Sequence, residues 1–108
     1  MKHRLESIVS EADRSVLENI ASLINREDYP LALRVIRQRL LQGFDISKPQ
    51  DAVLKAELAG FLIDIGSEGF IKEATIDGLN ILEKDGPFLR RFLSEETFEY
   101  NLDRKSVV

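Results

Sequence analysis

Apolar residues in the first quarter of the chain recur at steps of three and four, which predicts one stripe along a helix. Ser10 and Asp13 have the spacing of a capping box. Two arrangements therefore stay open: one long helix, or a helix that restarts near Glu11. The apolar positions are Leu5, Ile8, Val9, Ala12, Val16, Ile20, Leu23 and Ile24.

The next segment has both a start signal and a stop signal. Asp28 can cap free N–H groups, and Pro30 fits the first turn of a helix, where no N–H partner exists. Gly43 is the predicted stop, because glycine enters the left-handed position after a helix without strain. The helical spacing between them is carried by Leu31, Val35, Ile36, Leu40 and Leu41.

A third helix is predicted after Pro49, roughly from Gln50 to Ile65, and it is apolar on nearly every side. Such a helix packs against more than one neighbour, so we expect it to be the most buried element. Gly60 in its middle indicates a close approach between helices. The apolar residues are Val53, Leu54, Ala56, Leu58, Ala59, Phe61, Leu62, Ile63 and Ile65.

The remaining segments predict further helices. Gly66 to Gly69 is the expected turn, a fourth helix runs from Phe70 to Lys84, and Gly86–Pro87 ends it. A short helix from Pro87 to Leu93 and a fresh start at Ser94 follow. No stretch alternates with period two, so the fold class is all-α, built from antiparallel helix hairpins.

Two segments, 25–33 and 66–74, align as the turns of two helical hairpins. Each has an aromatic residue followed by a small one, Ala32 in the first and Ala74 in the second, where a larger side chain would push paired helices apart. This pattern resembles the tetratricopeptide repeat (TPR). The two alanines are 42 positions apart, against a family period of 34 residues; the excess fits the loop around Gly43 to Lys48.

The segments depart from the TPR pattern at four positions. Ile20 and Leu62 replace a small residue of the first helix in each unit. Gly78 stands where a larger apolar residue is usual, and Arg39 where a smaller one is usual. The resemblance implies stacked hairpins, a short TPR-like α-solenoid that is incomplete at its C-terminus.

The stretch Phe98–Leu102 resembles the opening of a well-formed TPR first helix, but the glycine expected next is replaced by Asp103. The last six residues, Asp103 to Val108, resemble the translation of a common sequencing adapter, GATCGGAAGAGCGTCGTGTAG. We therefore expect residues 1–102 to be a fragment of a longer TPR-like protein and 103–108 to be non-native. An ordinary basic tail is the alternative.

Composition limits the partners. The net charge is −4, which gives no reason to expect nucleic acid or an anionic membrane as a partner. Arg34, Arg37 and Arg39 form a basic cluster that we interpret as a solvated helix face. There is no cysteine, no apolar run of about 20 residues and no signal peptide. The expected location is cytoplasmic.

Catalytic and metal-binding patterns are not found in the sequence. The single histidine, His3, has no evident orienting partner. Asp64 in the apolar third helix is interpreted as a turn cap or an ion-pair partner, and Asp77 with Asn80 gives too few ligands for calcium. We expect no catalytic residues, no metal and no cofactor.

The function implied by the TPR resemblance is a non-catalytic scaffold for a peptide or partner protein. The first helix of each unit would line the groove, through Leu17, Ala21, Ile24, Ala59 and Ile63. Packing between helices is the alternative role for each of these residues. The rival function is an N-terminal regulatory or docking domain of a larger enzyme. The C-terminal edge, at Phe92, Phe98 and Leu102, has no following helix to cover it, so we expect self-association there or fraying beyond about Gly86.

Overall fold

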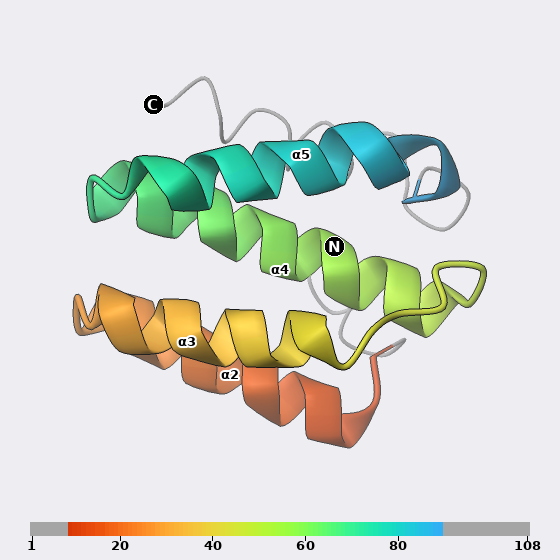
Figure 1. The fold of residues 1–108 in the computed structure, drawn as a ribbon. Coiled ribbons are helices and arrows are strands. Elements are labelled where there is room, and N and C mark those ends of the chain that lie inside the picture. The colour runs from red at the N-terminus through yellow and green to blue at the C-terminus, as the bar shows by residue number, and fades with distance from the viewer. Residues whose placement is uncertain (1–8, 90–108) are drawn as a thin grey trace.

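Two antiparallel helix hairpins form the described part of the chain. The computed structural model describes residues 9–89, with side chains through residue 87. The first hairpin pairs α2 (Glu11–Asn25) with α3 (Tyr29–Leu41), and the second pairs α4 (Pro49–Glu68) with α5 (Lys72–Leu89). The turns of both hairpins lie at the same end of the molecule, and the α3–α4 loop lies at the other (Figure 1). The all-α prediction is confirmed.

The ends of α2 and α3 follow local chemistry. Ser10 caps α2: its hydroxyl accepts a hydrogen bond from the Asp13 N–H at 3.2 Å, so this helix begins at Glu11. Gly43 follows α3 with φ +82°, which confirms it as the left-handed stop. Asp28 occupies the cap position of α3, but the prediction that its side chain caps the helix is wrong, because it makes no capping hydrogen bond.

The second hairpin is longer than its sequence signals indicate. The predicted turn at Gly66–Gly69 is wrong, because α4 continues to Glu68 and only Gly69 and later residues turn. Gly86–Pro87 does not end the fourth helix either, since α5 runs through Pro87 to Leu89. The apolar positions Leu5 and Ile8, the predicted helix start at Ser94, the C-terminal edge and segment 103–108 lie outside the described residues.

Helix α4 is the centre of the fold and contacts α2, α3 and α5. Its two apolar faces belong to different hydrophobic clusters, which confirms the prediction that it is the most buried element. One cluster joins α4 to the first hairpin through Ile20, Leu23, Ile24, Ala32, Leu33, Ile36, Leu54, Leu58, Leu62, Ile65 and Ala74. The other comprises Val9, Ala52, Val53, Ala56, Ala59, Ile63 and Leu82.

Glycines let α5 approach α4 closely. A Cβ atom on Gly78 would lie 2.7 Å from the Ala59 carbonyl oxygen and 2.8 Å from Ile63 Cγ1. A Cβ atom on Gly66 would lie 1.8 Å from Thr75 Oγ1 and 2.6 Å from the Thr75 nitrogen. The absence of a larger apolar residue at position 78 is thereby explained: a side chain there would separate the two helices.

Candidate functional site

The predicted groove residues do not form one open surface. Ala59 and Ile63 are fully buried and face α5 at Gly78, and Ile24 is buried in the first hydrophobic cluster. Leu17 and Ala21 of α2 are only partly covered. The groove assignment is therefore wrong for Ile24, Ala59 and Ile63, because helix packing already uses those side chains.

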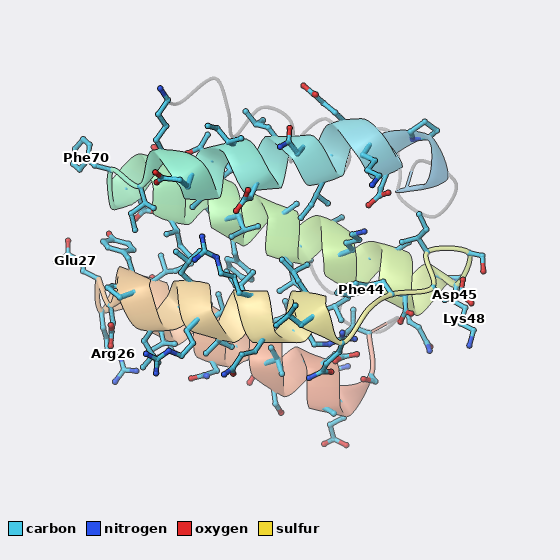
Figure 2. All side chains as sticks on the ribbon, viewed as in Figure 1. Arg26, Glu27, Phe44, Asp45, Lys48 and Phe70 are labelled. Carbon is cyan, nitrogen blue, oxygen red and sulfur yellow. The ribbon has the colours of Figure 1, made fainter. Side chains whose placement is uncertain are left out.

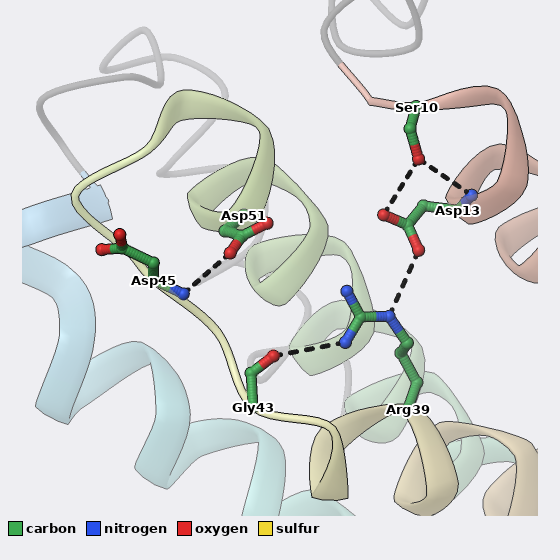
Figure 3. Close-up of polar contacts among 6 residues, drawn as sticks. All are labelled: Ser10, Asp13, Arg39, Gly43, Asp45 and Asp51. Carbon is green, nitrogen blue, oxygen red and sulfur yellow. Dashed lines mark hydrogen bonds and ion pairs between the residues drawn. The ribbon is translucent and has the colours of Figure 1, made fainter.

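A set of polar contacts joins α2 to α3 and the following loop at the end opposite the hairpin turns (Figure 3). Arg39 Nε lies 3.2 Å from Asp13 Oδ1, and Arg39 also donates a hydrogen bond to the Gly43 carbonyl. Its guanidinium carbon lies 4.5 Å from the centroid of the Phe44 ring. Arg39 therefore holds the helix and its exit loop in place.

The contacts continue across Phe44 to the second hairpin. Lys55 Nζ lies 5.6 Å from the Phe44 ring centroid and 2.6 Å from Asp85 Oδ2. Asp85 is 8% exposed, and an unpaired carboxylate at such a buried position would be costly. Together with Arg39, this pair ties all four helices to one another at this end, so we assign these charges a structural role.

The α3–α4 loop is fixed by two carboxylates. The Asp45 N–H donates to Asp51 Oδ2 at 2.7 Å (Figure 3). The Asp45 carboxylate accepts hydrogen bonds from the N–H and hydroxyl of Ser47. These Ser47 hydrogen bonds lower the pKa of the Asp45 carboxyl. The loop thus enters α4 in a defined conformation, ahead of Pro49.

The two hairpin turns close in the same way. The Asp28 N–H bonds to the Leu23 carbonyl at 2.9 Å, and the Ile71 N–H bonds to the Gly66 carbonyl at 3.0 Å. Each is the long hydrogen bond of a Schellman motif, with a left-handed residue just before the donor. These left-handed residues are Glu27 and Phe70, with φ 61° and 56°.

This shared geometry corrects the alignment of the two units. Glu27 and Phe70 are 43 positions apart, whereas the alignment of Ala32 with Ala74 has an offset of 42. Tyr29 and Phe70 therefore do not play the same part. The Tyr29 ring packs against Gly69, where an added Cβ would lie 2.9 Å from its Cδ2 atom. Burial, then the charges of Glu68 and Glu27, raise the pKa of the Tyr29 hydroxyl.

Phe70 is the least expected side chain of the structure. It is 93% exposed, and it projects from the hairpin turns at the same end as Glu27, while Arg26 points elsewhere (Figure 2). A bulky residue in the left-handed region is strained. In the sequence Phe70 is only the aromatic residue of the second turn pattern, and that pattern does not distinguish a packed ring from an exposed one.

Replacing Phe70 with glycine should raise the free energy of unfolding by about 1 kcal/mol, because glycine removes the left-handed strain and little buried area is lost. Glu27→Gly is the matched variant, since Glu27 has nearly the same φ and is also exposed. Urea unfolding followed by circular dichroism measures both. A loss of stability in Phe70→Gly alone would mean that the ring makes stabilising contacts.

Among the four described helices, α3 has the most basic composition. This helix contains three arginines and no aspartate or glutamate. Arg34 is exposed, and Arg37 NH2 lies 3.9 Å from Asp77 Oδ2 of α5, with both side chains about half exposed. Arg39 is turned inward, so the interpretation of all three arginines as a solvated face is wrong for Arg39.

The described residues form an all-α domain of two packed helical hairpins. Within residues 9–89, no group of three or more histidine, cysteine, aspartate or glutamate side chains is placed to hold a metal ion. No helix in that range has the length and apolar character of a membrane span. Comparisons with protein-family models, curated proteins and solved structures find no match to this chain.

Proposed function

We propose that this chain is a non-catalytic binding module, in which stacked helical hairpins present a surface to a peptide or a partner protein. The observation that carries the proposal is the repetition of one hairpin closure, at Glu27 and again at Phe70. Helix α4 also packs on both helices of the preceding hairpin. Arrays of stacked hairpins commonly serve as extended binding surfaces.

The 43-residue spacing bears on the type of repeat. It exceeds the 34 residues of a TPR unit and lies within the range of about 40–47 residues that is typical of HEAT and armadillo repeats. The proposal is therefore for a helical-hairpin repeat module, of which the TPR type suggested by the sequence is one form. Binding through such a module needs only a rigid surface, and packing on the central helix α4 holds the exposed faces of the other helices in place.

Selection from a random peptide display library tests this function. The purified full chain is the bait, and we expect enriched peptides that bind at one peptide per chain by isothermal titration calorimetry. The control bait carries Leu58→Ala and Leu62→Ala together, which removes two core side chains. If no peptide prefers the native chain to this variant, the binding function is wrong.

A further inference from the structure

We propose that the outer face of α3 is a docking site for an acidic amphipathic helix of a partner protein. This α3 outer face comprises Leu31, Arg34, Arg37, Gln38 and Leu41. The inference rests on the proposed binding function and names the surface and the partner chemistry. These side chains belong to neither hydrophobic cluster and take no part in the polar contacts around Arg39 and Phe44, so the fold does not explain why they are apolar or basic.

The geometry of α3 places these residues on one side. Positions 31, 34, 38 and 41 follow steps of three and four, which bring side chains onto a common face of a helix. All five residues of the α3 outer face are exposed, with Leu31 at 40% and Leu41 at 87%. The two leucines are separated by about 15 Å at a rise of 1.5 Å per residue, roughly three turns of a partner helix.

The charges on α3 favour an acidic partner. Helix α3 contains no carboxylate, although the chain as a whole has a net charge of −4. Arg34 makes no ion pair with any residue of the described range, and the Arg37–Asp77 pair at 3.9 Å is screened by solvent. Both guanidinium groups can therefore take the two-pronged hydrogen bonds that carboxylates offer.

The two leucines favour an acidic amphipathic helix over other anionic partners. An exposed leucine at each end of a basic stretch gains nothing from a nucleic-acid backbone, whose binding is driven by phosphate contacts. An amphipathic helix supplies apolar anchors several turns apart with acidic residues between them, as in other helix-to-surface recognition. Leu31 and Leu41 would then cover the two ends of the contact, with Arg34 and Arg37 between them.

The test uses a fluorescein-labelled synthetic helix with two leucines ten positions apart and glutamates between them. Fluorescence anisotropy with the full chain should show saturable binding that weakens as salt rises. The same peptide with glutamine in place of glutamate should bind at least about tenfold more weakly. Arg34→Gln with Arg37→Gln, and separately Leu41→Ser, should each weaken binding of the acidic peptide by about the same factor.

The matched control is Arg26→Gln with Lys72→Gln, which makes the same change in net charge at two exposed residues, one just after α2 and one at the start of α5. This control should bind the acidic peptide as the unchanged chain does, and circular dichroism should show all variants equally folded. Equal weakening by the Arg34/Arg37 variant and the Arg26/Lys72 variant would reduce the effect to net charge and overturn the assignment of the surface.

Other occupants give different results. Tighter binding of a single-stranded oligonucleotide or of phosphatidylserine vesicles than of the acidic peptide would overturn the proposal. So would a mass that grows with concentration in light scattering and returns to monomer in Leu41→Ser, because the occupant would then be a second copy. If peptides from the display library bind the full chain with affinities that Arg34→Gln and Arg37→Gln leave unchanged, the assignment of this surface is wrong and the proposed binding function stands.

Discussion

Replacing Leu58 with alanine should lower the free energy of unfolding by about 2–5 kcal/mol, and so should the same change at Leu62. Both side chains are fully buried, and both belong to the cluster that joins α4 to the first hairpin. Truncation removes buried methyl groups and leaves a cavity that a close-packed interior fills only in part. For a domain of this size the loss is a large share of total stability.

Urea unfolding followed by circular dichroism measures the effect. Leu41→Ala is the matched control, because Leu41 is a leucine at the end of α3 that is 87% exposed, and its truncation should change stability by no more than about 0.5 kcal/mol. Equal losses from Leu58→Ala and Leu41→Ala would contradict the central position of α4 in the core.

Gly66→Ala should destabilise the domain by about 1–3 kcal/mol or more, although alanine is normally the better residue within a helix by about 1 kcal/mol. The added Cβ would lie 1.8 Å from Thr75 Oγ1, 2.6 Å from the Thr75 nitrogen and 2.9 Å from the Ile71 carbonyl oxygen. Two of these atoms belong to the backbone, so α4 and α5 would have to move apart.

Thermal unfolding and urea unfolding both report this change. Glu68→Ala, an exposed position in the last turn of the same helix, serves as the control and should stay within about 0.5 kcal/mol of the unchanged chain. Thr75→Ala should relieve Gly66→Ala only in part, because it removes the hydroxyl and leaves the backbone contacts. A stabilising Gly66→Ala would mean that the helices do not meet at this residue.

Local sequence patterns predict a structural feature correctly where the interactions that determine it lie within a few residues of one another. Ser10 and Asp13 meet across one helical turn, so the capping spacing marks the start of α2. Gly43 adopts the one conformation that favours glycine after a helix. The apolar circumference of α4 indicates a helix with neighbours on several sides, and α4 contacts all three others.

Glycine and proline signals were ambiguous because the same residue serves two purposes. Gly66 looks like a turn residue in the sequence, yet it lies within α4, where it allows close packing against α5. Pro87 looks like a helix stop, yet α5 passes through it in its last turn. Proline lacks an N–H and disturbs the preceding turn, but near a helix end that loss is confined to a few residues.

The candidate binding surface is the feature that the sequence predicted least well, because it depends on how the helices pack. Ala59 and Ile63 have the spacing of groove residues, but an apolar side chain suits a neighbouring helix as well as a partner, and α5 covers both. Arg39 and Asp13 are 26 positions apart, so no local pattern predicts their ion pair. Local patterns in the sequence predict which segments are helical, although not where α4 and α5 end. Which faces stay exposed follows from how those helices pack, because burial depends on residues distant in the chain.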